Sequence, residues 1–317
     1  MISQVILVVL SILLFEIYFK IANHYNIIDK PNQRSSHTVL TIRGAGLVFP
    51  FIIFATLFFN IFTKNDGLNL IKEPIQFWIA LLVLSAISFY DDVKSLSPKF
   101  RILIQIITIA SVVFSSNTVI WQSLLALILI IGVINAYNFM DGINGITALY
   151  SLVAVITALV MLELDYQLVI GSEIWWALGA ALVVFSFYNV RKRARCFSGD
   201  VGAVSVAFVL SYWIYGLVIA NDNLIYVLFL GVYGLDSVAT IALRLYRKEN
   251  ILEAHRSHLY QLLANEKGWS HVKVSSIYAL TQAVINGLIL YNSFLAVVFF
   301  VLLSVGYILL RFKWAEQ

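Results

Sequence analysis

The chain has 317 residues, of which 61% are hydrophobic and 12% charged, and its formal net charge is +4. Soluble domains average about 45–50% apolar and about 25% charged residues, so this composition excludes an ordinary soluble protein and indicates one embedded in a membrane. The single cysteine, Cys196, excludes an internal disulfide.

Apolar segments recur along the whole chain, and most approach the roughly 20 residues that a helix needs to cross the hydrocarbon core. They predict an all-α, polytopic membrane protein with about eleven transmembrane helices, forming a single integral-membrane domain over residues 1–317. The predicted spans are 2–22, 44–63, 75–91, 102–116, 119–137, 146–163, 174–189, 202–220, 224–244, 275–291 and 293–311. The first is expected to be a retained span, because it lacks the basic start and cleavage site of a signal peptide.

Lysine and arginine gather in every second loop. Only Lys64 and Lys72 fall on the other side. By the positive-inside rule the basic loops are cytoplasmic, with the N-terminus outside and the C-terminus inside the cell. The cytoplasmic loops are about 23–43, 91–101, 138–145, 190–201 and 245–274. We therefore expect the active site on the cytoplasmic face.

These loops carry most of the side chains suited to chemistry. They contain, in chain order, DKPNQRSSH (29–37), TIRGAG (41–46), YDDVKSLSPKFR (90–101), NAYNFMDGING (135–145), NVRKRARCFSGDVGA (189–203) and RLYRKENILEAHRSHLYQ (244–261). A carboxylate at the bilayer centre costs roughly 2.5–3.5 kcal/mol, so acids at helix ends belong at the interface, where they can meet a polar ligand.

Asp91 and Asp92 are expected at the end of a helix, because the Ser-Leu-Ser-Pro that follows disfavours its continuation. A solvated helix end with two acids is the simpler interpretation. Lys94, Lys99 and Arg101 in the same loop favour a phosphate and metal site, since Mg²⁺ takes one or two carboxylates together with phosphate oxygens.

Two further loops have both a structural and a functional interpretation. Asn138 to Gly145 could be a plain turn, but its paired glycines also allow a ligand to approach the backbone. Asp200 could be only an N-cap, or its carboxylate could hold the magnesium that accompanies a phosphate at a helix start.

His255, Arg256 and His258 lie in the longest of these loops. On a helix the two histidines would share a face, which favours contact with a diphosphate. The alternative is an amphipathic segment lying on the lipid surface. No HExxH pattern or cysteine partner supports a zinc site here.

In this order and on these loops, the motifs resemble those of the polyprenyl-phosphate N-acetylhexosamine-1-phosphate transferases, from about Asp29 to about Val274. The resemblance implies transfer of an N-acetylhexosamine 1-phosphate from a UDP-sugar to undecaprenyl phosphate, giving undecaprenyl-diphospho-HexNAc and UMP, with Mg²⁺ or alternatively Mn²⁺. It places the chain in a bacterial inner membrane, at the first membrane step of O-antigen or another cell-surface polysaccharide. The HRSHLYQ form is similar to the subgroup that uses deoxy-N-acetylhexosamines for lipopolysaccharide.

The resemblance also implies roles for individual residues. Asp91, Asp92 and Asp200 match the catalytic acids, and the implied metal ligands are Asp200, Asp92 and Asp141. The implied substrate-binding residues are Asn138, Asp141, Asn144, Asn189, Phe197, His255, Arg256, His258, Lys94, Lys99, Arg101 and Arg43, with Phe197 stacking on uracil. Asn144 stands where many members of that family have a second aspartate. Because an asparagine side chain is neutral, this residue cannot serve as a charged ligand of a metal ion.

Several alternatives remain open. The lipid phosphate can attack directly, with Asp91 orienting it, or the reaction can pass through an aspartyl phosphate. A peptidoglycan-branch transferase or a transporter of a cation or lipid-linked sugar is the rival function, although transporters tend to place polar residues near the midplane. The DGxxAR run of a CDP-alcohol phosphotransferase is absent. The expected partners are the two substrates and the bilayer, with no nucleic acid, and a homodimer is an open alternative.

Overall fold

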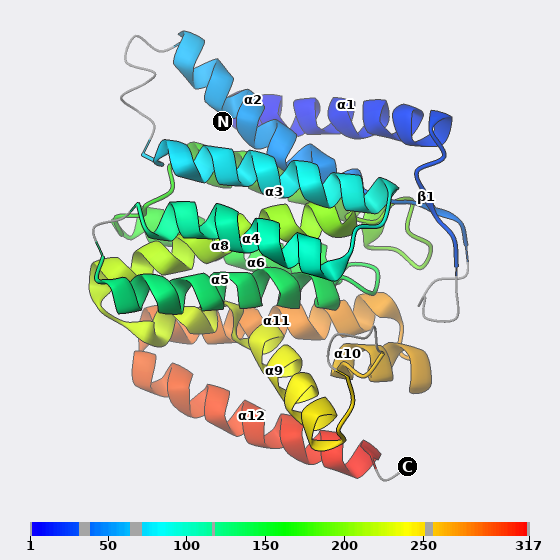
Figure 1. Ribbon diagram of the computed structural model, residues 1–317, viewed down its shortest axis with the longest axis vertical. Coiled ribbons are helices and arrows are strands. Elements are labelled where there is room, and N and C mark those ends of the chain that lie inside the picture. Colours follow the sequence, from blue (N-terminus) through cyan, green and yellow to red (C-terminus); the bar gives the residue numbers. More distant parts are fainter. Residues whose placement is uncertain (1, 32–38, 64–71, 116–117, 251–255, 316–317) are drawn as a thin grey trace.

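The computed structural model describes residues 2–31, 39–63, 72–115, 118–250 and 256–315. In this part of the chain, helices lie side by side in one bundle (Figure 1). They are α1 (Ile2–His24), α2 (Val48–Thr63), α3 (Ile75–Val93), α4 (Pro98–Val113), α5 (Ile120–Met140), α6 (Ile146–Glu163), α7 (Ser172–Asn189), α8 (Gly199–Asn221), α9 (Gly231–Tyr246), α10 (Leu259–Gln261), α11 (His271–Tyr291) and α12 (Ser293–Ala315). The predicted all-α, polytopic fold is confirmed.

Short elements complete the described part. They are the helical turns η1 (Ala45–Leu47), η2 (Leu224–Leu230) and η3 (Leu262–Glu266), and the strands β1 (Ile28–Asp29) and β2 (Thr41–Ile42). The two strands pair antiparallel, with Ile28 opposite Ile42, and Ile42 also bridges to Cys196. The strands thereby tie the segment after α1 to the loop before α8.

Each of the eleven predicted spans coincides with a helix, and nine of the described helical segments are long and apolar enough to cross a membrane. The other two are α4 and α7. With 16 residues, α4 is about 24 Å long, less than the roughly 30 Å of a hydrocarbon core. The polar residues Glu173 and Asn189 at its two ends reduce the hydropathy of α7. Helix α4 thus begins and ends earlier than the predicted span 102–116, and α4 and α7 are too short or too polar to count as membrane spans by length and hydropathy alone.

The centre of the bundle is α8, which packs against α3 and α5. Within its spanning segment 72% of the residues are buried inside the protein, against 11% for α12. The Ser85 hydroxyl of α3 and the Ser205 hydroxyl of α8 form a hydrogen bond of 2.8 Å. The N-terminal half of α8 is thus packed between other helices of the bundle.

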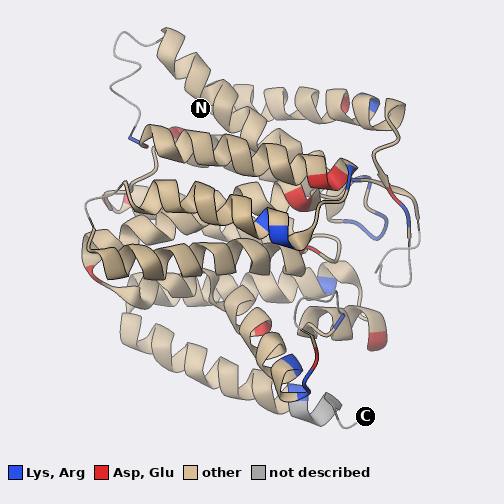
Figure 2. Cartoon of the chain, in the orientation of Figure 1, with Lys and Arg blue, Asp and Glu red and all other residues tan. Residues whose placement is uncertain are grey.

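Charged side chains gather at one end of the bundle, where α3 ends and α4 begins (Figure 2). The opposite end carries fewer of them. Most of the charged side chains lie at helix ends, although Asp236 of α9 is buried inside the bundle. Charge at helix ends is expected for a site at the membrane interface, because a charged group at mid-bilayer is costly. That this end faces the cytoplasm stays a prediction of the positive-inside rule.

Candidate active site

The segment from β2 to η1 is fixed against the start of α8. The N–H of Ala45 donates to the carbonyl of Phe197 at 3.0 Å. Gly46 and Gly202 lie so close together that a Cβ on Gly46 would overlap the backbone of Gly202. Because only glycine permits this approach, the chain can pass directly over α8, and Arg43 reaches the first turn of that helix.

The connection between α3 and α4 turns back on itself as predicted. Helix α3 ends at Val93 and α4 begins at Pro98. The Asp91 carboxylate accepts the N–H of Leu96 at 2.5 Å, and Arg101 in the first turn of α4 donates to the other oxygen of Asp91 at 2.6 Å. Asp91 therefore holds the turn together and orients the guanidinium of Arg101.

The Asp92 side chain is fully buried at the start of α8. Its two oxygens accept the N–H groups of Asp200 and Val201 at 2.9 and 3.0 Å, and the Nε of Arg43 lies 2.7 Å away. These are backbone donors that a helix leaves unsatisfied at its N-terminus, where a negative charge is also favourable. Asp200 was expected as the possible N-cap of α8. The structure shows that the carboxylate of Asp92, in α3, caps the start of α8 instead.

Asp200 joins both arginines. Its carboxylate lies 3.2 Å from Arg43 and 2.8 Å from Arg101, and the Asn138 amide donates to it at 3.5 Å. We call Arg43, Asp91, Asp92, Arg101 and Asp200 the carboxylate–arginine cluster. With three carboxylates and two guanidinium groups, its formal charge is −1 when all are ionised. The carboxylate of Asp92 raises the pKa of Arg43 above its usual value, against the effect of burial.

The cluster opens onto a polar cavity of about 250 Å³. The lining comprises Asp29, Arg43, Asn138, Asp141, Gly142, Ile143, Asn144, Asn189, Phe197, Gly199, Asp200, Gln261 and His271. Seven of these are residues that the sequence had nominated, and they come from three separate loops, those around Arg43, Asp141 and Phe197. The structure thus brings them together around one space; their individual roles stay predictions.

Asp141 connects the α5–α6 loop to the start of α8. Its two carboxylate oxygens accept the hydroxyl groups of Thr147 and Ser198. Burial raises the pKa of Asp141, which these two hydrogen bonds only partly oppose. Its carboxylate is therefore held in place while still lining the cavity, where a cation would favour its charged form.

Asn144 and Asn189 line the same cavity, but their amides also bind the backbone. The Nδ2 of Asn144 donates to the carbonyl of Arg191 at 2.8 Å. Asn189 accepts the N–H of Gly145 at 2.6 Å and donates to the carbonyl of Cys196 at 2.9 Å. Both asparagines hold the α5–α6 loop against the α7–α8 loop, so they shape the cavity wall whatever they do for a substrate.

We expect Asn144→Asp to lower the free energy of unfolding by about 1–3 kcal/mol, because a carboxylate would face the Arg191 carbonyl without a proton to donate. Thermal unfolding in detergent measures this. The matched control is Asn292→Asp, since Asn292 is exposed and its Oδ1 accepts backbone N–H groups, which a carboxylate also does. Equal loss of stability in both variants would contradict the assignment.

Several nominated residues lie outside the cavity lining. Lys94 and Lys99 are exposed beside the cluster, and Arg256 is half-buried. His258 is 2% exposed and pairs with Asp236 at 3.0 Å, so its position is inside the bundle rather than on the lipid surface. His255 lies outside the described residues.

Sequence reasoning missed four residues that contribute here. Asp29, Gln261 and His271 line the cavity, and Ser198 holds Asp141. Asp29 and Gln261 belong to motifs that the sequence had singled out. His271 starts α11 as an isolated histidine, so nothing in its neighbourhood marked it.

The predicted metal ligands are only partly suited to magnesium. Within the described ranges, no three His, Cys, Asp or Glu side chains are arranged to hold a metal ion. Asp92 is occupied by Arg43 and by the start of α8. Asp141 and Asp200 both line the cavity, and two carboxylates with room for phosphate oxygens match what Mg²⁺ prefers.

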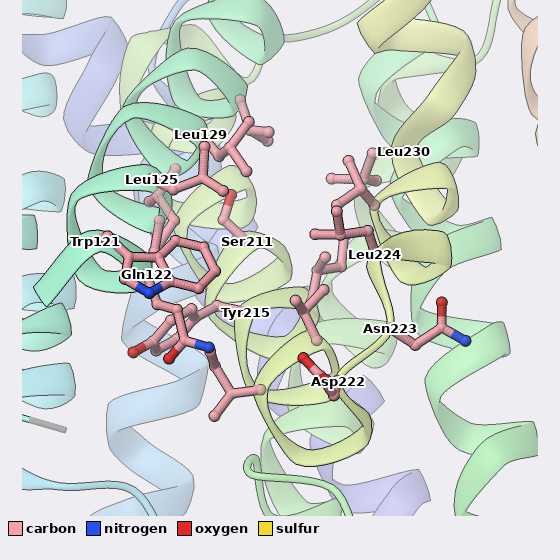
Figure 3. A pocket seen from close by; sticks show the side chains of 17 residues that line it. Trp121, Gln122, Leu125, Leu129, Ser211, Tyr215, Asp222, Asn223, Leu224 and Leu230 are labelled. Atoms are coloured by element: carbon pink, nitrogen blue, oxygen red, sulfur yellow. The ribbon is translucent and has the colours of Figure 1, made fainter. Parts of the chain in front are cut away.

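A second pocket, of about 260 Å³, lies between α5, the far half of α8 and η2 (Figure 3). Its walls are mostly apolar, with Leu125, Leu129 and Leu224 facing the space and Trp121 at one side. It lies toward the ends of α5 and α8 that are remote from the cluster. It offers no arginine or lysine to a phosphate, so the polar cavity is the candidate active site.

Residues 74–218 match the model of a family described as glycosyl transferase family 4. No curated protein matches the chain. The matched segment runs from just before α3 into α8, and it contains Asp91, Asp92, Asp141 and Asp200. The part of the chain that forms most of the candidate active site is therefore similar to glycosyl transferase family 4.

Proposed function

We propose that this protein transfers a sugar 1-phosphate from a nucleotide sugar to a polyprenyl phosphate in the membrane. The observation that carries the proposal is the carboxylate–arginine cluster, which opens onto a polar cavity at the end of a membrane-spanning bundle. The family match over residues 74–218 supports the same reaction class.

In its specific form, the donor is a UDP-N-acetylhexosamine and the acceptor undecaprenyl phosphate. The products are undecaprenyl-diphospho-HexNAc and UMP, at the first membrane step of O-antigen or another surface polysaccharide in a bacterial inner membrane. A site at helix ends suits this pair, because one substrate is soluble and the other has its phosphate at the interface. The excess of basic residues in the loops at this end supports a cytoplasmic location.

The two arginines can contact a diphosphate, but the carboxylates beside them leave the cluster with a formal charge of −1, so a metal ion is needed to balance the charge of the diphosphate. An oxygen of the lipid phosphate attacks the phosphorus that bears the sugar, and the bond from that phosphorus to the bridging oxygen breaks, so that UMP leaves with the electron pair. Arg43 and Arg101 neutralise charge as it moves, while Asp91 and Asp92 keep their guanidinium groups oriented. A phosphate monoester has its second pKa near 6, so the attacking oxygen needs no general base at neutral pH.

For magnesium we propose Asp200 and Asp141 as the ligands, with Asp92 as the residue that fixes the start of α8 rather than as a ligand. The ion would neutralise charge on the donor diphosphate. Exhaustive chelation is expected to lower UMP release by about 100-fold or more, and added Mg²⁺ or Mn²⁺ to restore it. Full turnover after chelation, with the chelator shown to hold all divalent ions, would overturn this assignment.

The experiment that tests the function supplies purified protein with undecaprenyl phosphate, Mg²⁺ and a panel of UDP-HexNAc donors, including deoxy forms. Product lipids are identified by mass spectrometry. We expect a lipid diphosphate carrying one HexNAc from at least one donor. Movement of a lipid or sugar across vesicles without any new lipid product would favour the transporter instead.

A further inference from the structure

Asp236 of α9 is a buried carboxylate outside the catalytic cluster. It is 0% exposed, and it accepts the hydroxyl of Tyr278 from α11 at 2.5 Å and that of Tyr307 from α12 at 3.1 Å. Thr240, one turn later in α9, donates to it at 3.2 Å. A buried carboxylate is tolerated only when its oxygens are fully hydrogen-bonded, and here three helices meet that need.

The same carboxylate holds the start of α10. It accepts the N–H groups of Leu259 and Tyr260 at 3.2 and 3.4 Å, and the Nδ1 of His258 lies 3.0 Å from it. His258 is itself the N-cap of α10 and exchanges hydrogen bonds with Gln261. Helix α10 continues directly into η3, and these contacts with Asp236 hold the first residues of this short helical segment.

The other side of α10 forms part of the candidate active site. The Tyr260 hydroxyl donates to the carbonyl of Phe139 at 2.8 Å, just before the α5–α6 loop. Gly142 in that loop leaves room for the Tyr260 hydroxyl, because a Cβ at position 142 would overlap it. Gln261 lines the polar cavity, as does Asn138. Asp236 is therefore connected to the cavity wall through a single short helix.

We propose that Asp236 is a positioning residue for the transfer reaction: it fixes the ring of His258 and the start of α10, and so places Tyr260 and Gln261 at the cavity that receives the diphosphate. This inference rests on the proposed function. When His258 is neutral, donation from Nδ1 to Asp236 also selects the tautomer with Nε2 as the acceptor. Groups that orient a site residue in this way commonly change activity by about 10–100-fold when replaced.

The test compares Asp236→Asn with wild type by UMP release and by hydrogen exchange of residues 259–261. An asparagine cannot accept all of the donors that face Asp236 and directs an N–H₂ group among them. We expect faster exchange at 259–261 and a fall in kcat of about 10–100-fold. In a His258→Gln background, the further effect of Asp236→Asn on kcat should be under about threefold, because the two residues act as one unit.

The control is Asn286→Leu, which breaks a buried hydrogen-bond network in α11 toward Thr157 and does not touch Asp236. It is expected to lower the melting temperature without changing kcat or exchange at 259–261. If Asp236→Asn does not fold, Tyr278→Phe removes one donor to the same carboxylate. For this variant, exchange at 259–261 should still rise and kcat should fall about 2–10-fold, the equivalent of one hydrogen bond.

The outcomes separate the two proposals. Absence of UMP release by the wild type overturns both. If the wild type turns over normally and Asp236→Asn has an unchanged kcat, only the positioning role is overturned. The same holds if the losses of kcat in Asp236→Asn and His258→Gln are independent and add up in the double variant. A purely structural carboxylate would lower stability and leave kcat per folded molecule unchanged.

Discussion

Replacing Asp200 with asparagine is expected to lower the turnover of sugar-phosphate transfer by about 10²–10³-fold. Asp200 is the carboxylate on which Arg43 and Arg101 converge, and it lines the cavity. An amide of the same shape leaves both guanidinium groups without this counter-charge and offers one fewer oxygen to a cation. The measurement is UMP release at saturating donor, acceptor and Mg²⁺, corrected for the folded fraction.

The matched control is Asp222→Asn. Asp222 is exposed, follows the other end of α8 and borders the apolar pocket (Figure 3). Loss of the Asp222 charge should leave the turnover of sugar-phosphate transfer unchanged. Near wild-type turnover in Asp200→Asn at saturating Mg²⁺ would show that neither the metal nor the arginines depend on this carboxylate.

Gly199→Ala is expected to have the second largest effect. Gly199 has φ +70°, and a Cβ there would lie 2.5 Å from an oxygen of Asp92. The backbone conformation alone costs an alanine about 1–2 kcal/mol. The displaced Asp92 would also shift Arg43 and the start of α8, and a misplacement of about 1 Å near the reacting groups can cost about 100-fold in rate. We expect a lower melting temperature together with a 100-fold loss of turnover.

Gly132→Ala is the control for this variant. Gly132 lies inside α5, where a Cβ would meet no heavy atom within 4 Å. Alanine in a helix interior is more stable than glycine by about 1 kcal/mol, so this variant should be equally active and slightly more stable. If Gly199→Ala behaved like Gly132→Ala, the close approach of Asp92 to α8 would be wrong.

Helices were the part of the fold most open to prediction, because a lipid environment requires long apolar segments with internally satisfied backbones. The end of α3 just after Asp92 could also be predicted, since the following Ser-Leu-Ser-Pro is typical of a helix end. The limits appeared at α4 and α7, where hydropathy does not reveal how short or polar a packed helix can be. The span 224–244 was predicted as a single segment, but no local pattern predicted that it would begin as η2 before it continues as α9.

Within the site, the sequence motifs predicted which residues belong to it, but they did not predict which groups each side chain would contact. Asp92 was expected as a metal ligand, yet its oxygens cap a helix that begins 107 residues later, a contact between α3 and α8 that no spacing predicts. Asn144 looked like a lost ligand, whereas its amide binds a backbone carbonyl. Asp236 was passed over because a single acid in an apolar helix carries no motif.

The central claim, that the carboxylate–arginine cluster moves a sugar together with its phosphate, is tested most directly by the nucleotide that leaves. Purified protein is incubated with a UDP-HexNAc donor that it accepts, with and without undecaprenyl phosphate, and the nucleotides are separated by chromatography. We predict UMP in one-to-one ratio with lipid diphosphate-HexNAc, and none without the lipid. Release of UDP instead, which would mean transfer of the sugar alone, or no nucleotide release with any donor, would contradict the account.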